Sequence, residues 1–128
     1  MNENEIAEVI LDIAFDIHRN LGPGLLESVY EEIIAYELKN RYDISYERQI
    51  PLSVNWKNVI LDKGFRIDIL VEKKVLIEIK SVEKLLPVHA KQVQTYLKLT
   101  GVKLGILINF NEALLKYGIK RIVNGLDL

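Results

Sequence analysis

Apolar residues along the first third of the chain recur with the period of a helix. In residues 5–20 and 25–40 they return every three or four positions, which predicts two amphipathic helices. Gly22-Pro23-Gly24 breaks the pattern and is expected to form a tight turn between them. The expected inner face of the second helix consists of Leu26, Val29, Ile33, Ile34 and Leu38.

The middle of the chain carries the pattern of β-strands. In residues 58–80 two apolar runs flank the polar tip Glu72-Lys73-Lys74, which predicts a hairpin. Residues 44–56 are rich in β-branched and aromatic side chains and predict one or two further strands. Pro51 is expected to mark an edge strand or a bulge, because proline cannot donate a backbone hydrogen bond.

The last third predicts a helix, a strand and a less regular tail. Pro87 is a favourable first residue for a helix over 87–100, and residues 103–109 predict a buried strand. Residues 112–123 are compatible with a short helical turn followed by an edge strand. The order α-α-β-β-β-α-β predicts one α/β domain over residues 1–128, with a mixed sheet flanked by helices. The helix between the third and fourth strands favours a parallel crossover.

The predicted hairpin separates apolar from charged side chains. If its tip is centred on Lys73, residue 68 lies opposite residue 78, and successive side chains point to opposite faces. One face is then an apolar core face, formed by Ile67, Ile69, Val71, Val75, Ile77 and Ile79. The other face carries Arg66, Asp68, Leu70, Leu76, Glu78 and Lys80.

On the second face two carboxylates, Asp68 and Glu78, are expected to lie ~5 Å apart, and like charges in such a pair are destabilising. Two arrangements would compensate. Arg66 and Lys80 could neutralise the carboxylates in a solvated network of ion pairs, or a divalent cation such as Mg²⁺ could lie between them. Leucines on the same face indicate that it is partly covered, as the wall of a cleft would be.

Composition narrows the possible functions. The 128 residues have a net charge of −1 and include no cysteine, which excludes disulfides, thiolate zinc sites and cysteine nucleophiles. Binding of a polyanion therefore requires a local basic patch, a second copy of the chain or a partner protein. The first residues lack the features of a secretory signal, and no apolar run reaches the ~20 residues of a membrane helix. We therefore expect a cytoplasmic protein without a membrane segment.

Three motifs, in order along nearly the whole chain, resemble those of a known superfamily. Asp68 followed by Glu78-Ile79-Lys80 resembles the core of PD-(D/E)xK phosphodiesterases, although Ile67 stands in place of the proline. The segment Gly24-Leu25-Leu26-Glu27-Ser28-Val29-Tyr30 fits the GxxExxY signature, and Gln92-Val93-Gln94-Thr95-Tyr96 fits the QxxxY motif of RecB-like members. The chain thus resembles the GxxExxY proteins, a branch of this superfamily, which implies a restriction-endonuclease-like fold.

The resemblance implies a site that binds Mg²⁺ or Mn²⁺. Its implied metal ligands are Glu27, Asp68, Glu78 and the carbonyl of Ile79. Lys80 would orient the attacking water or stabilise charge at phosphorus. Without the resemblance, Glu27 is better explained as an acidic residue in the first turn of a helix, where the helix dipole favours it.

Four further residues are expected to support the site. Gln92 and Tyr96 share one helix face, where they either approach the site or pack as an exposed amide beside a core tyrosine. Tyr30 lies one turn from Glu27. Arg66 has two open roles, binding phosphate or pairing with Glu78.

These expectations predict a metal-dependent nuclease with DNA as the favoured substrate. Two alternatives remain open from the sequence. One is a non-catalytic interaction module that retains the nuclease fold. The other is a hydrolase of a small phosphorylated ligand, which would need less positive surface than a nuclease.

Overall fold

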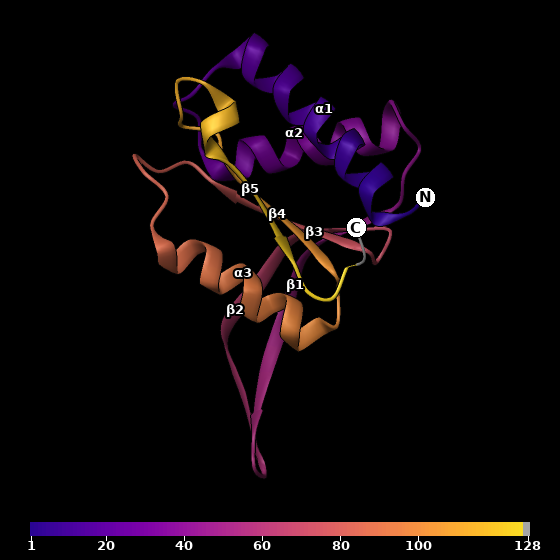
Figure 1. Cartoon of the computed structure of the whole chain (residues 1–128), viewed down its shortest axis with the longest axis vertical. Helices are drawn as coiled ribbons and strands as arrows, with labels where there is room; N and C mark the ends of the chain where they lie inside the picture. The colour runs from indigo at the N-terminus through magenta and orange to yellow at the C-terminus, as the bar shows by residue number, and fades with distance from the viewer. Residues whose placement is uncertain (127–128) are drawn as a thin grey trace.

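The computed structural model describes residues 1–126, apart from the side chain of Lys63. Two helices come first and three consecutive strands follow, before a third helix and the last two strands (Figure 1). In chain order they are α1 (Glu3–Leu21), α2 (Glu27–Asn40), β1 (Tyr46–Trp56), β2 (Val59–Val71), β3 (Val75–Lys80), α3 (Pro87–Thr100), β4 (Leu104–Asn109), the 3-10 turn η1 (Leu115–Gly118) and β5 (Ile119–Val123). The predicted α/β class and element order are confirmed, and the ambiguous tail contains both a helical turn and an edge strand.

The five strands form one mixed sheet in the order β1-β2-β3-β4-β5. β3 and β4 are parallel, and the other neighbouring strands are antiparallel. The hairpin of β2 and β3 pairs Ile69 with Ile77 and Val71 with Val75, a register centred on Lys73. The predicted hairpin register and the parallel crossover through α3 are therefore confirmed.

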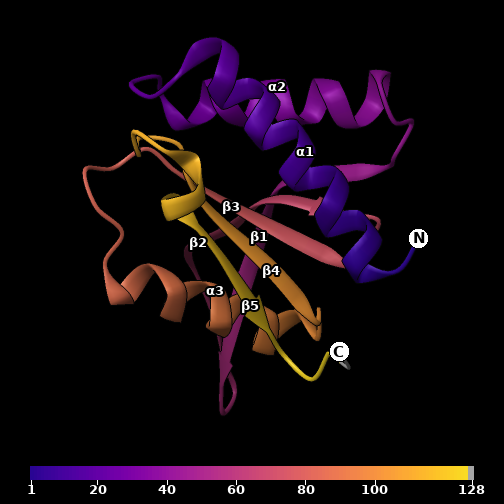
Figure 2. The same cartoon turned by 45° about the horizontal axis from the view of Figure 1, so that its top comes forward.

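Helices cover the sheet on both faces. α1 and α2 lie on one side and α3 on the other (Figures 1 and 2). One apolar cluster joins α1 and α2 to the sheet through residues such as Ile10, Ile34 and Ile77, and a second joins α3 through Leu76 and Val93. As a result every residue of β4 is buried, and so is every residue of β3 before its last. The charged face of the hairpin is partly covered, as its leucines indicated.

The buried face of α2 differs from the predicted one. Leu26 and Val29 are 73% and 38% exposed, whereas Tyr30 and Glu31 are buried. The helix begins at Glu27, two residues later than the periodicity indicated, and Leu26 is extended. Packing of the aromatic ring at position 30 selects the buried face, which rotates the two apolar side chains of the first turn towards solvent.

Local sequence sets the ends of the helices that flank the site. Pro87 occupies the first turn of α3, where its missing N–H costs nothing, and Gly101 ends the helix at φ +76°. α1 begins with a capping box, in which Asn2 and Glu5 each accept a hydrogen bond from the other's backbone N–H.

β1 and β2 are longer than the strands beside them. β3 pairs with β2 only as far as Ile69, so residues 52–65 pair with one another alone and project from the body (Figure 1). We call this segment the arm. The register shifts between Leu52 and Val54, next to Pro51, which lies in an edge strand as expected.

Candidate functional site

Asp68 lies where β2 and β3 diverge. The ladder between the two strands ends at Ile69 and Ile77, one residue before Asp68 and Glu78. The Asp68 carboxylate turns into this fork, and its Oδ2 accepts a hydrogen bond of 2.8 Å from the backbone N–H of Ile79. Asp68 is therefore held against the backbone of β3, the strand that carries Glu78. Its other oxygen, Oδ1, takes no part in this hydrogen bond.

Glu78 is a buried carboxylate with an unused oxygen. Its relative exposure is 4%, and its Oε1 is buried without a hydrogen bond to any described residue. Its Oε2 lies 3.9 Å from the Nζ of Lys80. Burial, followed by the negative charge of Asp68 and by a hydrogen bond that the protonated Glu78 carboxyl shares with Asp68, raises the Glu78 pKa to about 9, against the opposing effect of Lys80. In the protein alone this carboxyl therefore holds a proton at neutral pH.

Glu27 reaches the same region from the start of α2. Its Oε2 accepts a hydrogen bond of 3.2 Å from the backbone N–H of Ser81, the residue after Lys80. The Ser81 hydroxyl donates to the carbonyl of Leu25 at 2.7 Å and ties the turn before α2 to the end of β3. The negative charge of Glu27 also contributes to the raised pKa of Glu78. The structure therefore brings Glu27, Asp68, Glu78 and Lys80 together.

Tyr30 supports the turn rather than facing the site. Its hydroxyl donates to the carbonyl of Gly22 at 2.7 Å and accepts from the N–H of Leu25 at 3.2 Å. Its ring is fully buried and stacks on Phe110, with centroids 4.2 Å apart. The expected supporting role becomes an indirect one, because Tyr30 fixes the backbone that leads into Glu27.

α3 brings its predicted pair to the carboxylates. Tyr96 is buried in the apolar cluster beneath α3. Its pKa is raised by burial and then by the negative charge of Glu78, while contacts with the Arg66 backbone and the Gln92 side chain lower it. Tyr96 is thus both a core residue and a neighbour of the site. The guanidinium of Arg66 forms no ion pair with Glu78 among the described residues, so Lys80 is the cation that pairs there.

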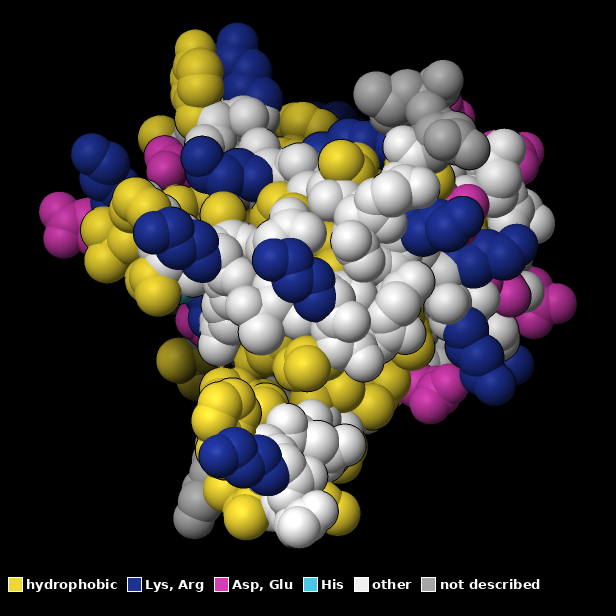
Figure 3. Space-filling model, turned by 60° about the horizontal axis from the view of Figure 1, so that its bottom comes forward, with side chains coloured by type: hydrophobic (Ala, Val, Ile, Leu, Met, Phe, Trp, Pro, Cys, Tyr) yellow, Lys and Arg dark blue, Asp and Glu magenta, His cyan; other side chains and the backbone are white. Residues whose placement is uncertain are grey.

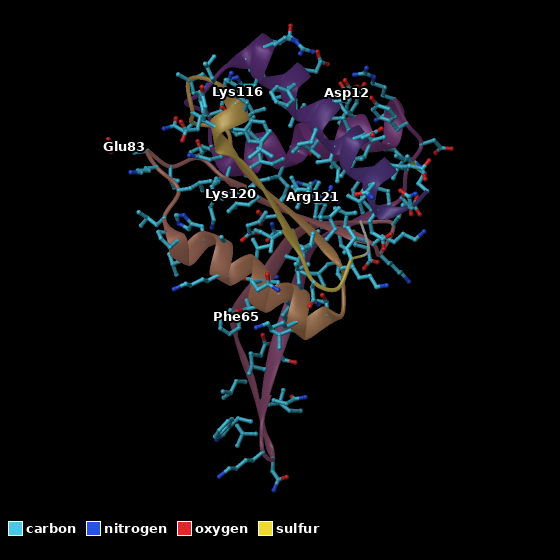
Figure 4. The ribbon with its side chains drawn as sticks, in the orientation of Figure 1. Asp12, Phe65, Glu83, Lys116, Lys120 and Arg121 are labelled. Carbon is cyan, nitrogen blue, oxygen red and sulfur yellow. The ribbon has the colours of Figure 1, made fainter. Side chains whose placement is uncertain are left out.

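A groove of about 460 Å³ adjoins the site. It lies between α3 and the base of the arm, where Phe65 is seen in Figure 4. We call it the α3 groove; it is lined by Phe65, Val88, His89, Lys91, Gln92, Thr95 and Tyr96. The Gln92–Tyr96 pair therefore forms a wall shared by the groove and the carboxylate site.

Polar contacts that link Asp68 to β1 and α2 were not predicted. Gln49 has a left-handed backbone, with φ +51°, and its Nε2 donates to Glu31 Oε1 at 2.7 Å and to Asp68 Oδ1 at 3.4 Å. Glu31 is buried and also accepts a hydrogen bond of 3.0 Å from Arg48 Nε. The spacing of Glu31 from Glu27, four residues on one helix, was the available signal. Nothing in the local pattern marks Gln49.

The donor set fits a hard divalent cation. Asp68 and Glu78 offer carboxylate oxygens, and the buried Oε1 of Glu78 has no partner in the described part of the chain. Over the same residues, no three His, Asp or Glu side chains form a ready-made metal cluster. Mg²⁺ does not require one, because one or two carboxylates with water and phosphate oxygens complete its shell.

The fold and this arrangement define an α/β protein with a carboxylate–lysine site at the fork of a β-hairpin. The family described as the PD-(D/E)XK nuclease superfamily matches residues 4–122, and the chain belongs to that superfamily. Membership suggests nuclease activity.

Among solved structures, the crystal structure of SSO0001 is similar, with a TM-score of 0.57 and 25% sequence identity. The match covers 78% of this chain and 50% of that chain, so this protein spans half the length of SSO0001. No curated protein matches the chain. No helix within residues 1–126 has the length and apolar character needed to cross a membrane.

Proposed function

We propose that the protein is a Mg²⁺- or Mn²⁺-dependent phosphodiesterase that cleaves nucleic acid, with DNA as the favoured substrate. The observation that carries the proposal is the buried Oε1 of Glu78, which has no partner among the described residues and lies beside a second carboxylate. Such a group is costly to bury unless it is protonated or binds a cation. A divalent cation between Asp68 and Glu78 removes that cost.

Asp68 and Glu78 are the proposed ligands, with the Ile79 carbonyl and Glu27 completing the protein side of the shell. The backbone N–H of Ile79 donates a hydrogen bond to Asp68, which fixes the peptide that follows Glu78. Glu27 is already held near the site by Ser81. When bound, the cation would lower the pKa of a coordinated water and neutralise charge on a phosphate.

Lys80 is proposed to act on the reacting groups. Its Nζ lies 3.9 Å from Glu78 Oε2, and its side chain is 20% exposed, so it is both oriented and within reach of a ligand. In this place it would hold the attacking water or a phosphate oxygen by a charge-assisted hydrogen bond. Arg66, which is exposed, is available to bind a phosphate further along the strand.

Gln92 and Tyr96 are proposed to position the substrate beside the carboxylates. They wall the α3 groove, and Tyr96 lies close enough to Glu78 for the ionised form of that carboxyl to raise the Tyr96 pKa. Together with the segment from Gly24 to Tyr30, this pair supports placing the chain in the GxxExxY branch with RecB-like features. The GxxExxY segment contributes through Glu27 as a ligand and Tyr30 as the support of its turn.

Calorimetry with Mn²⁺ tests the metal site. We expect Asp68→Ala and Glu78→Ala each to weaken binding at least tenfold. Glu83→Ala, which removes an exposed carboxylate on the loop before α3, should leave binding unchanged. Unchanged affinity in both site variants would remove the metal from the mechanism.

Cleavage assays test the activity. The protein is incubated with single- and double-stranded DNA and RNA in Mg²⁺ or Mn²⁺, beside Asp68→Ala and Lys80→Ala. Lys84→Ala, an exposed lysine outside the site, serves as the matched control. We expect DNA cleavage that the two site variants lose and the control keeps. Activity that persists in both site variants would mark a contaminating nuclease and refute the assignment.

A further inference from the structure

The arm carries an apolar face that the body does not cover. Val54 pairs with Leu61, and Trp56 with Val59. Side chains paired across two strands lie on the same face, so these four residues form one continuous surface. Trp56 is 65% exposed, and Val59 is 52% exposed. Hydrophobic side chains cover much of the lower projection in Figure 3 and continue where it meets the body.

The α3 groove lies at the base of this arm and is also largely apolar. Phe65, from the arm itself, lines it together with Val88 of α3, which is 59% exposed. An apolar arm and an apolar groove are therefore present on one molecule, one arm length apart. The arm cannot fill its own groove, because its rigid pairing carries the tip away from the body (Figure 1).

We propose that a second copy of this chain docks on the arm. Two arms would lie antiparallel across a two-fold axis, so that the tip of each, led by Trp56, enters the α3 groove of the other copy. Seven residues of strand from Val59 to Phe65, at ~3.3 Å each, make the arm about 20 Å long. Arms of equal length laid antiparallel place each tip at the other's base, which is the self-complementary contact that a two-fold dimer requires.

The available surface is adequate for such a dimer. Large hydrophobic residues on this face of the arm and beside the groove are between 37% and 65% exposed: Trp56, Val59, Leu61, Phe65, Leu86 and Val88. At about 200 Å² for a large side chain, these residues expose roughly 600 Å². Each partner in an interface of standard size buries about 600 to 1,000 Å², so this surface reaches the lower end of that range.

The arm is poorly suited to nucleic acid. Residues 52–65 contain two lysines and one aspartate. Binding to a phosphate backbone depends mainly on contacts from several basic side chains. The arm offers apolar area instead, which favours a protein surface.

The dimer would place the partner's arm beside Gln92 and Tyr96, next to the carboxylates. The inference rests on the arm and the groove alone, so it does not depend on metal binding or on cleavage.

Disulfide trapping tests the docking directly. Because the chain contains no cysteine, each introduced thiol is the only one present. Asn58→Cys, at the tip, is mixed with a size-tagged Thr95→Cys, in the groove, and oxidised. We expect a mixed disulfide between the two variants. Tagged Tyr36→Cys, on α2, replaces the groove variant as the control. Absence of the first product, or equal yields with the control, would overturn the arrangement.

Sedimentation of the full chain tests the dimer independently. We expect a species of twice the 14.8 kDa chain mass. Trp56→Glu should raise the dissociation constant at least tenfold, whereas Tyr36→Glu, which changes an aromatic residue with 63% exposure, should not. Both substitutions are on the surface, so folding is retained and is verified by circular dichroism. A wild-type monomer, or an unchanged dissociation constant in Trp56→Glu, would refute the proposal.

Discussion

The raised pKa of Glu78 makes a quantitative prediction about stability. The folded protein holds the Glu78 proton up to about pH 9, whereas the unfolded chain releases it near the ordinary glutamate pKa of 4.5. The folded state therefore binds more protons between these values, and the free energy of unfolding must fall as pH rises through that range. The contribution is fully present below pH 4.5 and is lost by about pH 9.

The size of this effect follows from the linkage relation. One proton of difference corresponds to about 1.4 kcal/mol per pH unit. From pH 6 to pH 8 the wild-type protein should lose up to about 2.7 kcal/mol through this single group. Glu78→Gln carries no titratable proton at this position, so its stability should lack this slope. Contributions from the two histidines are common to both proteins and cancel in the difference.

Urea unfolding in EDTA at pH 6, 7 and 8 measures the difference. The stability of Glu78→Gln relative to wild type should increase with pH, whatever the constant cost of burying the amide. Glu83→Gln, an exposed carboxylate, serves as the control and should run parallel to wild type. Adding Mn²⁺ should stabilise wild type increasingly at higher pH and Glu78→Gln much less. Parallel curves for wild type and Glu78→Gln in EDTA would refute the raised pKa.

Three further outcomes are expected. Binding of Mn²⁺ at pH 7 should release about one proton from Glu78, and the number released should fall towards zero above about pH 9. Calorimetry in buffers of different ionisation enthalpy measures the release, and its absence at pH 7 would contradict the raised Glu78 pKa. Tyr30→Phe removes the hydrogen bond to Gly22 and should cost about 1 kcal/mol in urea unfolding, so unchanged stability would argue against that contact. Gly118→Ala would drive a Cβ into the carbonyl oxygen of Asn109 and should cost more than about 1 kcal/mol in the same urea measurement. A neutral effect would mean that this turn adjusts without cost.

Much of the architecture was predictable because it depends on local periodicity. The alternation of side chains on either side of Lys73 is a property of extended backbone, and it correctly placed Ile69 opposite Ile77, where the ladder ends. Beyond that point the alternation was wrong, because Ile67 packs with Leu76 in the cluster beneath α3 and not with Ile69. The parallel pairing of β3 with β4 followed from the helix between them. The motif order also predicted the superfamily.

The environment of the site residues was less predictable. The burial that raises the pKa of Glu78 comes from the packing of α3 over the sheet, and no local pattern measures how closely a distant helix packs. Tyr30 was assigned near the site, but its hydroxyl bonds to the Gly22 turn. Arg66 was one candidate partner of Glu78, and Lys80 is the observed one.

By itself, therefore, the sequence determined the succession of helices and strands, the register of the hairpin and the residues that carry the chemistry. These properties depend on backbone periods and on the spacing of side chains along one segment. Tertiary structure alone decided that Asp68 bonds to the peptide of Ile79, that Gln49 links it to Glu31, and that the arm stands free of the core. These outcomes depend on contacts between segments far apart in sequence, where packing and not periodicity sets the geometry.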